Sequence, residues 1–161
     1  MPKKIVYFAG AMRGDRVVAD NMKAMVIFIR DELKYPVLTE HVVKDQPIES
    51  LPAEEIEKRD INWLDTATHV IAEISGASTG TGREIEYART KGTFGKTPAY
   101  ILCLYRADLK EKASPMIRGM DQKRYPNVTI AGYDTMDMAK KLIKKFLVPP
   151  PLKIRGGREG L

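Results

Sequence analysis

Along the chain, short apolar runs alternate with longer stretches in which apolar residues recur every three or four positions. Short β-branched or aromatic runs predict buried strands, and the longer spacing predicts helices with one apolar face. We expect strands at residues 4–9, 36–38, 70–74, 99–104 and 128–130. The chain therefore reads as an α/β protein.

Helical periodicity fills most of the segments between these strands, and polar residues with Gly and Pro fill the others. Because strands alternate with helices, we predict a doubly wound, Rossmann-like or flavodoxin-like sheet of about five mainly parallel strands, with helices on both faces. We expect helices over 18–33, over 53–66, from Gly82 onward and over 139–146, loops over 45–52 and 92–98, and a loop or short irregular helix over 106–118.

The last residues of the chain differ in composition from the rest. Pro149, Pro150 and Pro151 end the last predicted helix, because proline removes a helical hydrogen bond, and Gly and Arg residues follow. A length of 161 residues fits one domain. We predict one domain over residues 1–148 and a flexible tail over 149–161.

Composition places the chain among globular proteins, with 43% hydrophobic and 30% charged residues. No apolar run approaches the ~20 residues of a membrane span, and the opening Met1 to Lys4 leads into a strand rather than a signal peptide. We therefore expect a cytoplasmic protein without a membrane partner. The single Cys103 lies in an apolar run, which predicts a buried thiol.

The net charge of +6 raises the question of nucleic-acid binding. No aromatic residues interleave with the basic ones, as a surface that stacks single strands would require. A solvated basic face is the favoured interpretation, and a tail that binds nucleic acid stays open as an alternative. The clustered bases are Lys140, Lys141, Lys144 and Lys145 on one predicted helix, and Lys153, Arg155 and Arg158 on the tail.

The stretch from Thr68 to Ala88 has the strongest functional pattern. A buried strand runs into a turn of Gly, Ser and Thr residues and then into a helix, which places amide groups and a positive helix end where an anion can bind. Glu84 adds a carboxylate at the same point. The local pattern Thr81 to Glu84 also fits a capping box, and taken alone it favours a cap over a catalytic carboxylate.

Other polar residues follow strands that should end in the same crevice. The first strand runs into the turn Gly10 to Gly14, which contains Arg13, and His41 follows the second strand. This convergence favours a functional Glu84. Asp60 falls near the centre of the apolar arc of helix 53–66, and catalysis or simple pairing with Arg59 explains it equally well.

Several known kinds of site are missing from the chain. Ile85 stands where a dinucleotide fingerprint has its third glycine, and there is no GxxxxGK[ST] loop, no GxSxG elbow and no recognisable spacing of metal ligands. We therefore expect neither a cofactor nor a metal. The remaining carboxylates, arginine and serines suit metal-free glycosyl chemistry on a nucleotide.

Six segments in matching order resemble the nucleoside 2-deoxyribosyltransferase superfamily, and most closely its 2'-deoxynucleoside 5'-phosphate N-hydrolase branch. The similarity extends from Tyr7 to about Phe146. The segments are YFAGAMRG, VLTEHV, RDINWL, VIAEISGASTGTGREIEYA, ILCLYR and SPMIRG. The resemblance implies hydrolysis of the N-glycosidic bond of 2'-deoxynucleoside 5'-monophosphates. Base exchange between deoxynucleosides and a non-catalytic nucleotide-binding module are the alternatives.

The resemblance also implies roles for individual residues. Glu84 would be the nucleophile, and Asp60 and Tyr7 would complete the catalytic group. His41 would lie near the base. A homodimer is expected, because Ser114 and Met116 would reach into the partner's site. The phosphate would be held by Arg13, Ser78 and Ser114, and the wider substrate-binding set would be Tyr7, Phe8, Ala9, Gly10, Ala11, Met12, Arg13, Gly14, His41, Ser78, Gly80, Gly82, Ser114, Pro115 and Met116. Ala11 departs from the hydrolase pattern, which has a serine there.

Overall fold

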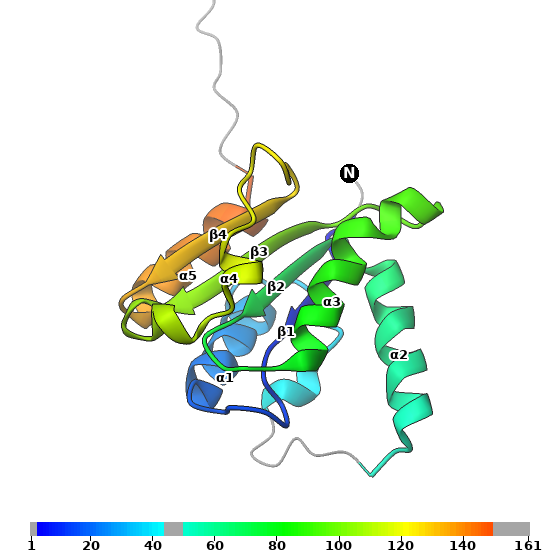
Figure 1. The fold of residues 1–161 in the computed structure, drawn as a ribbon, viewed down its shortest axis with the longest axis horizontal. Coiled ribbons are helices and arrows are strands. Elements are labelled where there is room, and N and C mark those ends of the chain that lie inside the picture. The colour runs from blue at the N-terminus through cyan, green and yellow to red at the C-terminus, as the bar shows by residue number, and fades with distance from the viewer. Residues whose placement is uncertain (1–2, 44–49, 150–161) are drawn as a thin grey trace, which may run out of the picture.

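The computed structural model describes residues 3–43 and 50–149 (Figure 1). Its centre is a parallel sheet of four strands in the order β1-β2-β3-β4. In register, Tyr7 of β1 lies opposite Val70 of β2, and Ile71 of β2 lies opposite Leu102 of β3. The predicted α/β class is confirmed. The strands are β1 (Val6–Ala9), β2 (His69–Glu73), β3 (Tyr100–Arg106) and β4 (Val128–Tyr133).

The predicted strand at 36–38 is wrong, so the sheet has four strands rather than about five. Val37 forms only an isolated parallel bridge with Val6. The ladder stops because the Thr39 hydroxyl takes the next backbone positions, accepting from the Phe8 amide at 2.9 Å and donating to the Phe8 carbonyl at 2.8 Å. The chain then turns into the 3-10 segment η2 (Glu40–Val43).

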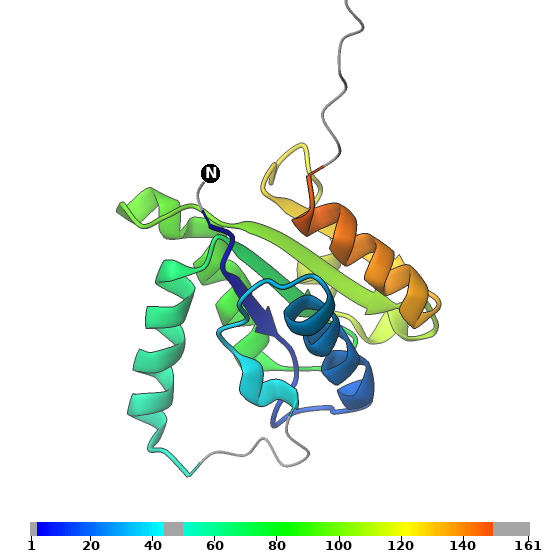
Figure 2. The same ribbon diagram turned by 180° about the vertical axis from the view of Figure 1, so that it is seen from behind.

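Helices cover both faces of the sheet, as predicted (Figures 1 and 2). Phe8, Ile71 and Leu104 pack under α1 and α5 on one face, whereas Val70 and Ile101 pack with α2 and α3 on the other. Successive strand residues point to opposite faces, and every residue of β1 and β2 is buried, so these two strands are covered on both sides. The central residues of β4 are half-buried. The helices are α1 (Ala19–Ile27), continued by the π-helical segment η1 (Phe28–Glu32), α2 (Ala53–Thr66), α3 (Thr79–Thr90), α4 (Pro115–Arg118) and α5 (Met136–Leu147), with 3-10 segments η3 (Lys91–Phe94) and η4 (Ala107–Lys112).

A buried lysine fixes α2 against α3. Lys91 follows α3 and is fully buried, and its Nζ donates to the carbonyls of Asp65 at 3.3 Å and Ala67 at 2.7 Å. Both carbonyls lie at the C-terminal end of α2, where backbone acceptors lack partners within the helix. The Lys91 ammonium group therefore caps the C-terminal end of α2 and fixes the position of α2 relative to α3.

Other sequence predictions have different outcomes. Cys103 is buried, as expected. No helix within the described ranges is long and apolar enough to cross a membrane. The tail after Pro149 and most of the loop predicted over 45–52 lie outside the described residues, so the division at residue 148 stays a prediction. The cytoplasmic location also stays a prediction.

Candidate active site

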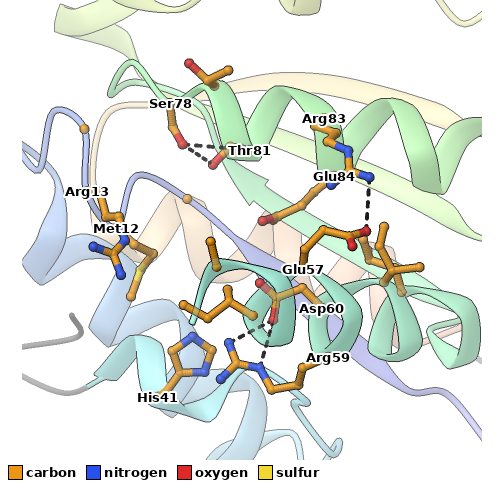
Figure 3. Close-up of a pocket in the computed structure, with 18 of the residues that line it drawn as sticks. Met12, Arg13, His41, Glu57, Arg59, Asp60, Ser78, Thr81, Arg83 and Glu84 are labelled. Atoms are coloured by element: carbon orange, nitrogen blue, oxygen red, sulfur yellow. Dashed lines mark hydrogen bonds and ion pairs between the residues drawn. The ribbon is translucent and has the colours of Figure 1, made fainter. Parts of the chain in front are cut away.

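A pocket of about 890 Å³ opens at the carboxyl ends of β1 and β2, between α2 and α3 (Figure 3). The bridge at Val37 lies on one side of β1, and β2 lies on the other. The segments that follow Val37 and β2 therefore lead away on opposite sides of β1. This divergence opens a crevice at the carboxyl ends of the strands, where α/β sheets bind their ligands. Gly10, Arg13, His41, Asp60, Ser78 and Glu84 all line it.

Glu84 is not the cap of its helix. Helix α3 begins at Thr79, and its N-cap is Ser78, whose Oγ accepts the Thr81 amide at 3.2 Å and the Thr81 hydroxyl at 3.0 Å. Thr81 is thus inside the first turn rather than before it, and the interpretation favoured by the local pattern is wrong. The Glu84 carboxylate instead accepts a hydrogen bond from the Tyr7 hydroxyl.

The electrostatic setting of Glu84 is unusual for a glutamate. Burial, followed by the negative charge of Asp60, raises its pKa to about 8, while the Tyr7 hydrogen bond and Arg83 act in the opposite direction. Tyr7 is 2% exposed, and its own pKa is raised far above the ordinary value by burial and by Glu84 and Asp60. Tyr7 therefore remains a neutral donor aimed at the carboxylate.

Asp60 faces the same space from α2, as Figure 3 shows. Arg59 holds it, with Nε at 3.0 Å and Nη2 at 2.9 Å from the same Oδ1 atom. The Arg59 pairing considered from the sequence therefore exists. It does not remove Asp60 from the site, because the Asp60 carboxylate lines the pocket and bears electrostatically on both Glu84 and Tyr7.

Two strand-end turns meet at one end of the pocket. A side-chain carbon on Gly14 would lie 2.1 Å from the Ala77 carbonyl oxygen, and one on Gly76 would lie 2.1 Å from the Asp15 carbonyl oxygen. The Asp15 amide also donates to the Ala77 carbonyl at 3.2 Å. Only glycine permits this approach. It brings the Arg13 turn beside the N-terminus of α3, a combination that favours an anion.

A second wall of the pocket is formed by His41 and Arg59, which both pack on Trp63, a residue outside the pocket lining. His41 stacks on Trp63 with ring centroids 5.9 Å apart, and the Arg59 guanidinium lies 4.5 Å from the Trp63 ring centroid. The sequence alone suggests Arg59 only as a partner for Asp60. The spacing of Arg59 and Trp63, four residues apart on one helix, was the signal that could have identified this wall.

Met12, Gly14 and Gly80 also line the pocket, whereas the remaining expected residues do not. Tyr7, Ala9 and Ala11 are buried, the Phe8 side chain packs on the opposite face under α1, and Gly82 has open space around it. Ser114, Pro115 and Met116 do not line this pocket; Ser114 caps α4, and Met116 is 82% exposed. Within residues 3–43 and 50–149 no group of His, Cys, Asp and Glu side chains could hold a metal ion.

No family model matches the chain, but curated proteins do. The chain is 33% identical over 144 residues to a protein of Thermofilum pendens provisionally named 2'-deoxynucleoside 5'-phosphate N-hydrolase 1. The alignment covers 88% of this chain and 94% of that protein. This chain is 38% identical over 120 residues to the 5-hydroxymethyl-dUMP N-hydrolase of Rattus norvegicus, covering 71% and 68%.

Solved structures agree on the fold. The CMP N-glycosidase BcmB of Clostridium botulinum superposes with a TM-score of 0.62 at 22% identity, covering 89% of this chain and all (100%) of that one. The solution structure of BlsM superposes with a TM-score of 0.63 at 20% identity, covering 94% and 98%. At these identities the two structures support the Rossmann-like architecture alone.

Proposed function

This chain belongs to the 2'-deoxynucleoside 5'-phosphate N-hydrolase family, and we propose that it hydrolyses the N-glycosidic bond of 2'-deoxynucleoside 5'-monophosphates. The products are a free base and 2-deoxyribose 5-phosphate. The observation that carries the proposal is the meeting of Glu84 and Asp60 in one pocket, beside a turn pair suited to an anion.

The proposed mechanism uses Glu84 as a nucleophile. A Glu84 oxygen attacks C1' as the bond from C1' to the base nitrogen breaks, and the base leaves with the bonding electrons and takes up a proton. Water then attacks C1' of the glycosyl-enzyme, releases Glu84 and loses a proton. A deoxysugar lacks the electron-withdrawing 2'-hydroxyl, so positive charge develops at C1' more easily. The Tyr7 hydrogen bond supports the ionised Glu84 that the attack requires.

Asp60 and the anion site have positioning and acid roles in this proposal. Arg59 restrains Asp60 on α2, where its carboxylate is placed to assist protonation of the departing base or to orient the groups around it. Arg13 and the amides at the start of α3 would hold the 5'-phosphate and so fix the sugar against Glu84. His41, stacked on Trp63, would lie against the base.

We also propose a homodimer in which Ser114 and Met116 complete the site of the partner subunit. Met116 is 82% exposed, and neither residue lines the pocket of its own chain. Mixing a Glu84→Ala variant with a variant altered at Ser114 and Met116 tests this. Mixed dimers would regain one intact site, so activity should return on mixing. Failure to recover activity, or a monomer by sedimentation, would contradict the shared site.

The function is tested by chromatography after incubation with the four deoxynucleoside monophosphates and their ribose counterparts. We expect free base from the parent protein and none from Glu84→Ala, which should still bind nucleotide. Arg13→Ala should narrow the preference for monophosphates over nucleosides. A new nucleoside after a deoxynucleoside is mixed with a different free base would indicate base exchange instead. Tight nucleotide binding without turnover would indicate a binding module.

A further inference from the structure

A buried carboxylate lies just outside the pocket and takes no part in the proposed chemistry. Glu73 ends β2, is 1% exposed and projects to the face of the sheet opposite Glu84, towards Tyr133 and α1. A carboxylate in such a place is costly unless its oxygens are well hydrogen-bonded. Burial raises the pKa of Glu73, and the bonds from Tyr133 and Ser75 lower it.

Both oxygens of Glu73 have defined partners. Oε1 accepts the Ser75 amide at 2.5 Å, and Oε2 accepts the Tyr133 hydroxyl. The Tyr133 oxygen in turn accepts Asn21 Nδ2 at 3.2 Å. The fully buried Ser75 accepts the Arg106 amide on its Oγ at 2.8 Å. Glu73 thus joins the carboxyl ends of β2, β3 and β4 to helix α1.

The residues held in this way begin the turn that forms one end of the pocket. Ser75 is followed by Gly76, which presses against the Asp15 carbonyl, and by Ala77, whose carbonyl presses against Gly14 and accepts the Asp15 amide. Ala77 and Ser78 then line the pocket. A shift at Ser75 is transmitted to both turns, because close-packed backbone does not deform locally.

We infer that Glu73 is a positioning residue for recognition of the substrate phosphate, acting through the Ser75 amide to hold the turn from Ser75 to Ser78 against the Arg13 turn. The inference rests on the proposed function, because that function places the substrate phosphate at these two turns. Glu73 does not touch substrate, and it is not needed for the attack of Glu84 on C1'.

The test compares kcat/KM for the preferred deoxynucleoside monophosphate with kcat/KM for the matching deoxynucleoside. Glu73→Gln keeps the side-chain volume but loses the charge that strengthens the Ser75 bond, and we expect the monophosphate preference to fall about fivefold. Glu73→Ala leaves the Ser75 amide buried without an acceptor and should lower the preference more than about tenfold. Turnover of the nucleoside should change little in either variant.

Tyr133→Phe is the matched control, because it removes the bond to Oε2 and leaves the bond from Oε1 to Ser75 in place. Its monophosphate preference should equal that of the parent. The inference is overturned if Glu73→Gln retains the parent preference, if monophosphate and nucleoside turnover fall together, or if Tyr133→Phe loses the preference as strongly. Glu73→Gln decides the matter if Glu73→Ala does not fold.

A binding measurement separates this inference from the proposed function. Inorganic phosphate should raise the melting temperature of the parent and of Tyr133→Phe, and raise that of Glu73→Gln less. If the parent releases no base from any deoxynucleotide, the proposed function fails. The rise in melting temperature with phosphate then supports or overturns the role of Glu73 without any activity measurement. Equal phosphate responses in all three proteins would overturn it.

Discussion

Tyr7→Phe removes one hydroxyl and should change how the activity depends on pH. That hydroxyl donates to the Glu84 carboxylate and lowers the pKa of Glu84, which burial and Asp60 raise to about 8. Attack on C1' requires ionised Glu84, so kcat/KM of the parent should rise with pH and level off above about pH 8. Without the hydroxyl, ionisation should require a higher pH.

The size of the effect follows from the hydrogen bond that is lost. A bond to a charged acceptor is worth about 1.5–3 kcal/mol, which corresponds to about one to two pKa units. At pH 7 the ionised fraction of Glu84 is about one tenth in the parent and should fall to between about one hundredth and one thousandth in Tyr7→Phe. We therefore expect kcat/KM at pH 7 to fall about tenfold to hundredfold, and to approach the parent value near pH 10.

The assay is kcat/KM for base release between pH 5 and pH 10, measured for the parent, Tyr7→Phe and Tyr87→Phe. Tyr87 is a matched control: it lies on α3, and its hydroxyl donates to Asp65 at 2.5 Å, away from Glu84. Its variant should keep the parent profile. If kcat/KM of Tyr7→Phe is lower by the same factor at every pH and its acid limb does not move, Tyr7 does not lower the pKa of Glu84.

Three other changes have defined outcomes. Asp60→Asn removes a charge that raises the pKa of Glu84, so the acid limb of kcat/KM should move to lower pH even as kcat falls; an upward shift would contradict this. Glu84 has a folded-state pKa above its ordinary value, so its contribution to stability is fully present below about pH 4.5 and is lost as pH rises through about 8. By urea denaturation, Glu84→Gln should therefore gain stability relative to the parent over this range, by about 4 kcal/mol at pH 8. A difference that stays constant with pH would count against a raised pKa. Lys91→Met leaves two carbonyls at the end of α2 without their buried donor and should lower the free energy of unfolding by about 1–3 kcal/mol; unchanged stability would show that the cap contributes nothing.

Local sequence patterns were reliable for most of the elements and misleading at two places. The apolar run at 36–38 has strand character, yet the Thr39 hydroxyl takes the backbone groups of Phe8 that a longer ladder would use. Ser78 and Thr81 are both good caps, and the pattern ending at Glu84 favoured Thr81. The structure uses Ser78, because the turn after β2 is held in place by neighbours distant in sequence.

The alternation of strands and helices could be predicted from the amino-acid sequence, and with it the gathering of strand-end turns, Arg13, His41 and Glu84 at one edge of a parallel sheet. These follow from periodicity and from residues close together along the chain. Three features become visible in the folded chain alone: Tyr7 supports Glu84, Lys91 caps α2, and Glu73 joins Ser75 to Tyr133. Each of these joins groups from different elements in a buried setting. The pKa of a carboxylate and the partner of a buried amide depend on that setting, and residues nearby in sequence do not specify it.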